Sequence, residues 1–146
     1  MSRAYTPSRV INGTFGSVWL DGTPLPQGTK LEATVSLNKE EIKQTGTLAK
    51  GYKIAGSEGK GTLGMNKIDS TMIELLSDDM KNGKTTEHTL LSNLDDPDAF
   101  GNERIQFNGV IFDELKLADW EAGKMGEESI PFTFTSWDIL EDIQPE

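Results

Sequence analysis

The sequence has no cysteine and only one histidine, His88, among its 146 residues. The lack of cysteine excludes disulfide bonds, thiolate metal sites and catalysis by a cysteine nucleophile. A Ser-His-Asp triad would have to be built around His88, which stands between Glu87 and Thr89 in a strand-like run. No partner motif accompanies this histidine, so we interpret it as an ordinary strand side chain.

Basic residues are scarce as well. Fourteen Lys and Arg stand against 24 Asp and Glu, which gives a net charge of −10. A field of this sign repels phosphate, whereas a protein that holds nucleic acid by counterion release carries the opposite sign. There is also no basic stripe with interleaved aromatic residues. The charge therefore argues against tight binding of nucleic acid.

Long hydrophobic runs are absent. The first ten residues, MSRAYTPSRV, lack the apolar segment of a secretion signal, and no later run approaches the length of a membrane span. We expect a chain that is made and used as a soluble protein. Its length suits one domain around one core, so we expect a single domain over residues 1–146.

Turn and strand formers are plentiful, with fifteen glycines and many Thr, Ser and Asp residues. Residues 15–20 read as a strand that runs into a tight turn at Asp21-Gly22. The strictly alternating segment 29–39 reads as its half-buried return strand. Residues 130–135 alternate in the same way and predict a final strand, with Pro131 at an edge or near its start.

Further strands are predicted at residues 61–68, 86–94 and 103–120. Asn108-Gly109 interrupts the last of these as a bulge or a two-residue turn, and we favour the bulge. One helix is predicted from the helical spacing of four apolar side chains: Met72, Leu75, Leu76 and Met80. Asp69, Ser70 or Thr71 can cap it, Thr71 and Glu74 fit a capping box, and Asn82-Gly83 supplies the stop.

Three segments have too little apolar content to bury themselves. They are an N-terminal arm at residues 1–12, a long loop at residues 39–60 and an acidic, loose tail at residues 139–146. Ordering a loop costs about 1–2 kcal/mol per residue, more than the sparse apolar side chains of residues 40–59 can offset alone. We expect this loop to be mobile in a free subunit and ordered only against neighbouring copies.

Several motifs admit a functional reading and a structural one. Gly59, Gly61 and Gly64 match a dinucleotide-binding spacing, but they lack the preceding strand and following helix, so we read them as sites of close backbone approach. The acidic loop at residues 95–103 could bind calcium, although a solvated turn is favoured. The three tryptophans, Trp19, Trp120 and Trp137, could form a platform that stacks on sugars. We favour positions in the core or at subunit contacts for them.

The order of four segments along the chain resembles a known family. They are NGTFGSVWLDG near the N-terminus, DSTMIELLSDDMKNG, LDDPDAFGNERI at residues 94–105, and LADWEAGKMGEESIPFTFTSWD at residues 117–138. Their succession is similar to that of the tail tube proteins of contractile-tailed bacteriophages and phage-tail-like particles. These are related to the inner-tube proteins of contractile injection systems.

The resemblance implies a mainly β fold, an antiparallel β-sandwich or small barrel with one flanking α-helix. Six copies would form a ring in which adjacent sheets join into one inner barrel. Rings would stack into a hollow tube inside a contractile sheath, as a conduit for DNA or a needle through an envelope. Such a protein is a structural subunit, not an enzyme, and it uses no cofactor or metal. We also expect acidic side chains to predominate on the channel wall, so that DNA passes without being tightly bound.

By the same resemblance, the partners are the chain itself, the sheath protein, and the tape-measure, baseplate and tail-terminator proteins, with no membrane anchoring. The expected location is the tail of a virion or tail-like particle that is assembled in the bacterial host cytoplasm. Subunit contacts would fall on the arm, the long loop and the C-terminal end. The residues expected there are Tyr5, Val10, Ile42, Leu48, Tyr52, Ile54, Trp137 and Ile139.

One departure from the family pattern is the pair Pro24 and Pro26 just after the first turn, which leaves the register of that hairpin open. An alternative from another class also remains. It is a small soluble β-sandwich binding module, for instance carbohydrate-binding, with Trp19 or Trp137 as a platform. Rings or tubes in negative stain would favour the tail reading, and a clean monomer at high concentration would favour the module.

Overall fold

The computed structural model describes residues 4–145, which form a mainly β fold with one α-helix. All paired strands are antiparallel, so the predicted class is confirmed. None of the helices in residues 4–145 has the length and apolarity of a membrane span. The elements are η1 (Pro7–Arg9), η2 (Gly13–Phe15), β1 (Gly16–Leu20), β2 (Thr23–Pro24), β3 (Gly28–Ile42), β4 (Gly51–Asn66), α1 (Thr71–Lys81), β5 (His88–Leu94), β6 (Glu103–Phe112), β7 (Glu127–Phe134) and β8 (Ser136–Glu141).

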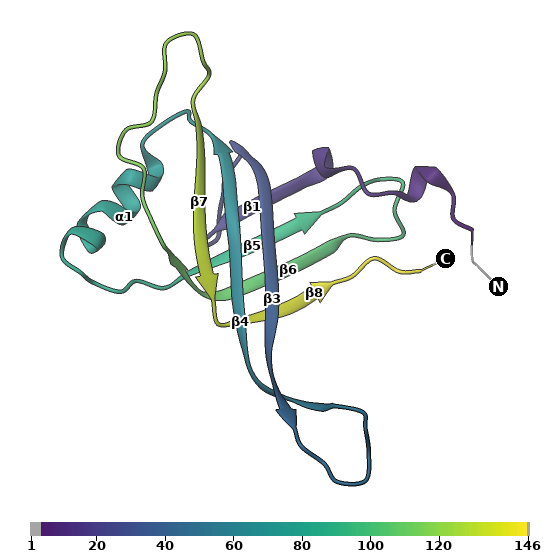
Figure 1. Cartoon of the computed structure of the whole chain (residues 1–146). Helices are drawn as coiled ribbons and strands as arrows, with labels where there is room; N and C mark the ends of the chain where they lie inside the picture. Colours follow the sequence, from purple (N-terminus) through teal and green to yellow (C-terminus); the bar gives the residue numbers. More distant parts are fainter. Residues whose placement is uncertain (1–3, 146) are drawn as a thin grey trace.

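The strands form two crossed layers that share one strand. The order is β2-β1-β5-β6-β7-β4-β3, and β8 pairs with β6. In Figure 1, β1, β5, β6 and β8 run across the view, while β7, β4 and β3 run down it. The first part of β6 lies between β5 and β8, and its last two residues pair with β7. The strand path ends at β2 and β3, so the fold is a sandwich joined along one side and not a closed barrel.

Strand β6 changes layers at Gly109. This residue has a φ of +64°, and the pairing of β6 with β5 shifts register beside it, between His88 and Leu90. A β-carbon at Gly109 would also collide with the side chain of Thr135. The bulge predicted at Asn108-Gly109 is therefore confirmed, and it is the point at which the sheet folds over.

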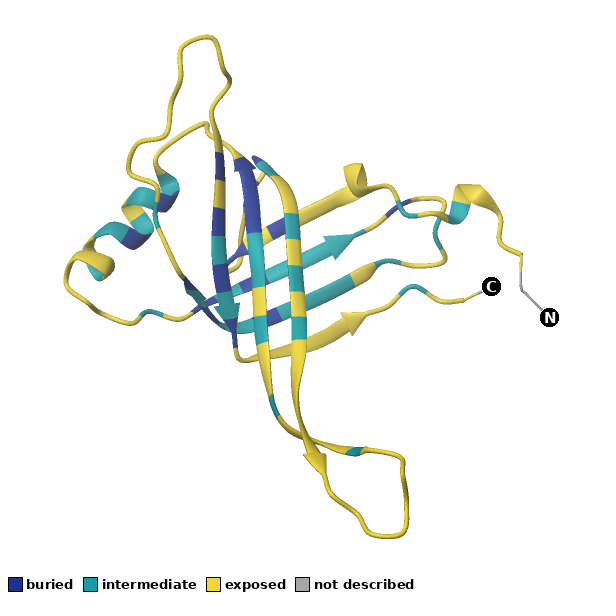
Figure 2. Cartoon of the chain, in the orientation of Figure 1, coloured by how far each residue is buried: buried dark blue, intermediate teal, exposed yellow. Residues whose placement is uncertain are grey.

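The core lies where the two layers cross, and Figure 2 shows the buried segments gathered there. Four phenylalanines from β6 and β7 pack in a chain of tilted and edge-on rings: Phe107, Phe134, Phe132 and Phe112. Helix α1 contributes Met72 and Leu76 to the same apolar cluster. These interlocked side chains fix the relative position of the two layers.

Helix α1 matches the prediction, but its start differs in detail. The Asp69 carboxylate accepts hydrogen bonds from the Thr71 hydroxyl at 2.6 Å and the Thr71 backbone N–H at 3.1 Å. Because Thr71 is the first helical residue and its hydroxyl is used in this way, the expected capping box with Glu74 is absent. The helix ends at Lys81, followed by Asn82 and by Gly83 with a φ of +66°.

The first hairpin is only partly as predicted. The turn at Asp21-Gly22 forms, with φ of +51° and +83°, and joins β1 to β2. The expected return strand at residues 29–39 belongs instead to β3, which pairs with β4. Pro24 and Pro26 explain the difference, because neither can donate a ladder hydrogen bond and β2 stops after two residues.

Two segments expected to be loops form strands. Residues 39–60 lie mostly in β3 and β4, whose pairing continues to Ile42 and Gly51, so only residues 43–50 form the connection. The tail expected at residues 139–146 is paired as far as Glu141, in β8. Both predictions rested on the scarcity of apolar residues in these segments. These strand parts lie beyond the core, where backbone hydrogen bonds hold a ladder without burying side chains.

The glycines of β4 and the proline of β7 support the close packing of this layer. A β-carbon on Gly61 would meet the Glu32 carbonyl and the Phe132 ring. This agrees with the prediction that these glycines allow close approach of another part of the backbone. Pro131 is the fifth residue of β7, which lies between β4 and β6, so its expected place at an edge or near the start of a strand is wrong. Its carbonyl accepts from the Asp113 N–H, so its nitrogen points away from β4, towards the side where the pairing of β6 with β7 ends at Phe112.

Candidate assembly surface

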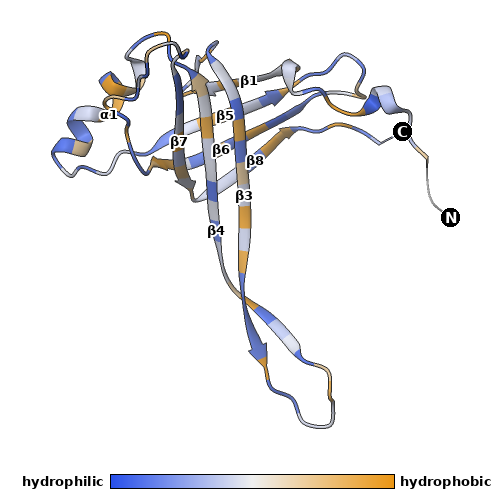
Figure 3. Ribbon diagram, turned by 45° about the horizontal axis from the view of Figure 1, so that its top comes forward, coloured by the Kyte–Doolittle hydropathy of each residue, from blue (hydrophilic) through white to orange (hydrophobic). Residues whose placement is uncertain are grey.

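The part of the β3–β4 hairpin that extends beyond the core, residues 39–54, is here called the projecting hairpin (Figure 1). It carries four of the predicted contact residues, all exposed: Ile42, Leu48, Tyr52 and Ile54. The register pairs Lys39 with Ile54 and Glu41 with Tyr52, so Tyr52 and Ile54 share one face. Figure 3 shows hydrophobic segments on both strands. The cross-strand partners Lys39 and Glu41 lie on the same face as Tyr52 and Ile54, so apolar and charged side chains alternate on this candidate contact surface.

Strand β8 forms a second exposed surface. All six of its residues are exposed, and among the described strands it pairs only with β6. Trp137 lies opposite Phe107, on the core-facing side of the sheet, and its ring meets Phe134 edge-on at 6.5 Å between centroids. Ile139 follows on the same side opposite Ile105. On the core-facing side of the sheet, the apolar surface therefore extends from β6 to Trp137 and Ile139 of β8, where no second layer covers it.

The backbone of β8 also has a free edge. Consecutive residues of a strand direct their N–H and C=O groups to alternate sides. The Asn108 carbonyl accepts from the Thr135 N–H, so Asn108 and, by alternation, Gln106 direct their backbone groups towards β8. Asp138 is the partner of Gln106. The backbone N–H of the next residue, Ile139, therefore points to the outer edge.

The N-terminal arm, described from Ala4 to Asn12, carries the exposed side chains of Tyr5 and Val10. Its end is fixed by Asp96, whose carboxylate accepts hydrogen bonds from the backbone N–H groups of Asn12 and Asp98, both at 2.9 Å. Asp96 is 5% exposed, so the acidic loop is not the fully solvated turn expected from the sequence. Its buried carboxylate clamps the arm.

Phe100 joins this arm to the C-terminal tail. The Arg9 guanidinium lies 4.5 Å from the centroid of its ring, and its carbonyl accepts a 2.9 Å hydrogen bond from the Gln144 N–H. Figure 1 places both termini at this end of the β1–β5–β6–β8 layer. Two of the three segments expected at contacts, the arm and the C-terminal end, therefore lie together, and the projecting hairpin lies apart.

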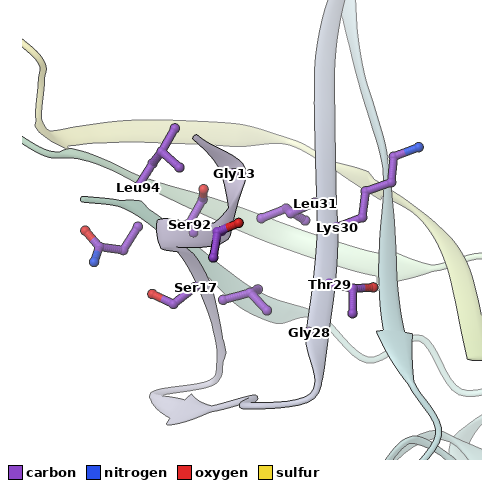
Figure 4. A pocket seen from close by; sticks show the side chains of 12 residues that line it. Gly13, Ser17, Gly28, Thr29, Lys30, Leu31, Ser92 and Leu94 are labelled. Carbon is purple, nitrogen blue, oxygen red and sulfur yellow. The ribbon is translucent and has the colours of Figure 1, made fainter. Parts of the chain in front are cut away.

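A groove of about 490 Å³ marks the gap between β1 and β3. Figure 4 shows Leu31 of β3 on the side of the groove that faces Ser92 and Leu94 of β5, with Lys30 on the opposite side of β3. A β-carbon at Gly28 would come within 2.5 Å of Val18, so the two strand ends approach most closely there. The groove is the opening of the unclosed sheet and holds no cluster of catalytic groups among its lining residues.

The connection between β6 and β7, residues 113–126, exposes three large apolar side chains. Trp120 is 86% exposed, Met125 is 93% exposed and Leu117 is exposed as well. The sequence predicted a strand through residue 120, but β6 ends at Phe112. The sequence allowed the core or a subunit contact for each tryptophan. None of the three is buried, so the core alternative is wrong.

His88 has an acidic partner that the sequence did not reveal. Its Nδ1 lies 2.8 Å from the Asp21 carboxylate, whose other oxygen accepts the Thr89 N–H, and its ring packs 5.6 Å from Phe112. The pair ties the β1–β2 turn to the start of β5. Across residues 4–145 no group of three or more His, Cys, Asp or Glu residues is arranged to hold a metal ion.

The sequence and fold match known proteins over almost the whole chain. A family model described as "Phage tail tube protein" matches residues 3–141. A solved structure of a Bacillus subtilis protein is 34% identical, with a TM-score of 0.54, and covers 90% of this chain and 96% of its own. None of the curated protein sequences matches.

Two further solved structures share the fold at low identity. One is the extended sheath-tube complex of an extracellular contractile injection system, PVC, with 10% identity, a TM-score of 0.71, and coverage of 93% of this chain and 98% of that one. The other is the tube-terminating cap of the anti-feeding prophage, also with 10% identity and a TM-score of 0.71, covering 97% and 95%. At this identity the likeness shows a common fold.

Proposed function

The chain belongs to the phage tail tube protein family, and on this premise we propose that six copies form a ring and that rings stack into the hollow tube of a contractile tail. Family membership makes the chain a structural tail tube subunit and not an enzyme. It is a component of a phage tail or tail-like particle. The tube then serves as a conduit for DNA or as a needle driven through an envelope.

The observation that carries the ring proposal is the free edge of β8. An exposed strand with an unpaired edge is a template for pairing with another chain, and soluble proteins normally block such edges. Here the edge is six residues long, bears Trp137 and Ile139, and contains no proline. Pairing of β8 with the sheet of the next copy covers both its backbone groups and its apolar side chains.

The same arrangement assigns a face to the channel. One face of the β1–β5–β6–β8 layer packs on the core, so the opposite face lines the channel once the layers of six copies join. By register that face carries Ser17 beside Asn93 and Gln106 beside Asp138. The charged residues of this face are Arg104, Asp138 and Glu141. Acidic groups outnumber basic ones only by two to one, and the remaining residues are neutral polar ones together with the apolar pair Trp19 and Leu91.

Neutral amides and a weak negative charge suit a passing polyanion. The Asn108 amide donates to the Asp138 carboxylate at 3.0 Å and accepts from Gln106 at 2.8 Å, so these side chains already satisfy one another. A wall of this kind offers few free donors to phosphate. We therefore propose that DNA passes without being tightly bound.

The remaining partners follow from the same proposal. The outer side of the tube faces a contractile sheath, one end meets the baseplate, the other meets a terminator, and a tape-measure protein occupies the channel during assembly in the host cytoplasm. The solved structures of similar fold come from a sheath-tube complex and a tube-terminating cap. The exposed residues of the arm, the projecting hairpin and β8 are the contacts we propose for the tube itself.

Replacing Ile139 tests the β8 edge. Ile139→Pro removes the outward N–H and the apolar side chain, whereas Ile139→Ala removes only the side chain and is the matched control. We expect the wild-type protein and Ile139→Ala to form hexameric rings, by sedimentation and negative-stain images. Ile139→Pro should remain a folded monomer, with an unchanged far-UV spectrum, because proline is tolerated where the N–H faces outward.

Rings formed equally well by Ile139→Pro would contradict edge pairing through β8. A wild-type protein that stays monomeric at high concentration would contradict the ring itself and favour a binding module.

A further inference from the structure

The subunit has two unlike ends along β4. This strand has sixteen residues, which at the usual rise per residue span about 50 Å. Residues 43–50, the tip of the projecting hairpin, precede its first residue. Its last residue, Asn66, pairs with Glu127, directly after the 113–126 connection. Figure 1 accordingly places the tip and the connection at opposite ends of the β3–β4–β7 layer.

The 113–126 end offers a pocket in which apolar and charged side chains meet. It has a volume of about 320 Å³ and lies between the start of α1 and this connection. Ile73, Leu117 and Trp120 supply its large apolar side chains, and charged residues that include Asp119 and Glu127 complete the lining. The base of the site is held firmly. The Lys67 N–H donates to the Gly126 carbonyl at 2.8 Å, and the Lys67 ammonium meets Glu128 at 2.9 Å. The opposite end presents a fully exposed Leu48 at the tip.

The charges of the two ends are opposite. The tip, residues 43–50, contains Lys43 and Lys50 and no acidic residue, so its charge is +2. Residues 113–126 contain four acidic residues and two lysines, for a charge of −2, and the adjacent helix α1 adds a further −2. Complementary fields speed the encounter of matching surfaces and disfavour contacts between like ends.

We propose that the tip of the projecting hairpin in one copy docks on the 113–126 connection of a second copy in the next ring, with Leu48 entering the pocket beside Trp120. This inference rests on the proposed tube. A contact between two different surfaces is heterologous and repeats without limit along an axis. The docking thus accounts for open-ended stacking in one orientation, whereas β8 accounts for closure of the ring.

Removal of Trp120 is the first test. Its side chain is exposed, so Trp120→Ala leaves the melting temperature of the subunit unchanged, whereas loss of an aromatic anchor at a contact raises the critical concentration for tubes about 30-fold or more. Rings should persist. Leu37→Ala is the control, because Leu37 is an exposed apolar residue of β3 outside the projecting hairpin, the 113–126 connection and β8, and its tubes should form as in the wild type.

Charge inversion is the second test. We expect two double variants to form rings but few tubes: Lys43→Glu with Lys50→Glu, and Asp119→Lys with Glu121→Lys. A chain that carries all four substitutions should form tubes again, because the charges of the two ends are then complementary once more. Because the protein has no cysteine, Ala49→Cys with Ala118→Cys, which keeps Leu48 and Trp120, and a short bismaleimide should also link copies in assembled tubes into ladders.

The docking would be overturned if the wild-type protein forms tubes, Trp120→Ala forms them equally well and no cross-linked ladder appears. The proposed function would still stand in that case. A wild-type protein that forms neither rings nor tubes would overturn the proposed function, and the docking with it.

Discussion

Gly61 of β4 and Phe132 of β7 form a cross-strand pair in which the phenyl ring lies over the glycine, in the place where a β-carbon would project. The ring covers a backbone that has no side chain of its own. It also touches the aromatic rings of β6 and β7 that fill the core. The pair is therefore a point at which β4 and the core are held at a fixed separation.

Gly61→Ala is expected to destabilise the subunit by about 1–3 kcal/mol, because the new methyl group must displace the Phe132 ring or the Glu32 carbonyl. Gly56→Ala is the control in the same strand, where the nearest atom to a β-carbon belongs to the Asn38 side chain at 3.7 Å. It should be neutral or slightly stabilising. Chemical denaturation of both variants measures the difference, and equal stabilities would contradict this account.

Lys67→Met is expected to destabilise the subunit by about 1–3 kcal/mol, because Glu128 is 8% exposed and would lose its ionic partner. The double variant Lys67→Met with Glu128→Leu should recover most of the loss, since it leaves no unpaired carboxylate. A double-mutant cycle by denaturation gives the coupling. Additive effects of the two changes would show that the pair is not coupled.

Asp96→Ala is expected to release the N-terminal arm. The backbone N–H groups of Asn12 and Asp98 would lose their acceptor, at a cost of about 1–3 kcal/mol for a buried, charged acceptor. Hydrogen exchange at the Asn12 amide should accelerate strongly. Asp98→Ala keeps the acceptor and serves as the control, with slow exchange at Asn12. Fast exchange in both variants would show that Asp96 does not hold the arm.

The first turn of α1 should be sensitive to acid. The hydrogen bonds from the Thr71 hydroxyl and backbone N–H lower the pKa of Asp69 in the folded state, with a smaller contribution from Lys67. A lowered folded pKa contributes stability that is present above the unfolded pKa of the group and is lost as the pH falls through the folded pKa. The protection factors of the α1 amides, which correct for the intrinsic pH dependence of exchange, should therefore fall below pH about 4. Asp69→Asn should remove most of this dependence, and an unchanged pH profile in that variant would contradict it.

The projecting hairpin should exchange faster than the core half of the same two strands in the free subunit. Its ladder is intact, but residues 39–54 pack against no second layer, so local opening exposes little apolar surface. Assembly should slow the exchange, and Leu48→Ser with Tyr52→Ser and Ile54→Ser should impair tubes without changing subunit stability. Strong protection of these amides in the monomer would contradict the expectation.

The elements predicted from the sequence are those whose signals are local or whose side chains are buried. Met72 and Leu76 recur at helical spacing before a glycine stop, and α1 forms there. Alternation around Phe132 likewise located β7, because every second residue faces the core. The bulge was recognisable from the phase slip around Asn108-Gly109.

Strand β8 and the outer parts of β3 and β4 were not predicted as strands. All six residues of β8 are exposed, so its side chains carry no periodic burial that a sequence could display. The main partner of β1 also depends on contacts distant in the chain, since β1 pairs with β2 only through Trp19 and Leu20 but along its whole length with residues 90–94.

All eight residues predicted at subunit contacts are exposed, which agrees with the reason for choosing them. They were singled out because their segments contain too few apolar side chains to form a core. The 113–126 connection was not among the predicted contact segments, because Leu117 and Trp120 stand in residues 103–120, which were predicted as one strand. Only the end of β6 at Phe112 shows that they lie outside the sheet.

Strand β6 bends at Gly109 and continues from one layer into the other, so the two layers are joined by unbroken main chain as well as by packing. A push delivered along β3, β4 and β7 therefore reaches the layer proposed to line the channel through covalent bonds. Side-chain packing resists such shear only until neighbouring groups slide, whereas a continuous backbone does not slip. In the proposed tube, the layer that carries the projecting hairpin and the layer that lines the channel would therefore move together, because the main chain of β6 belongs to both.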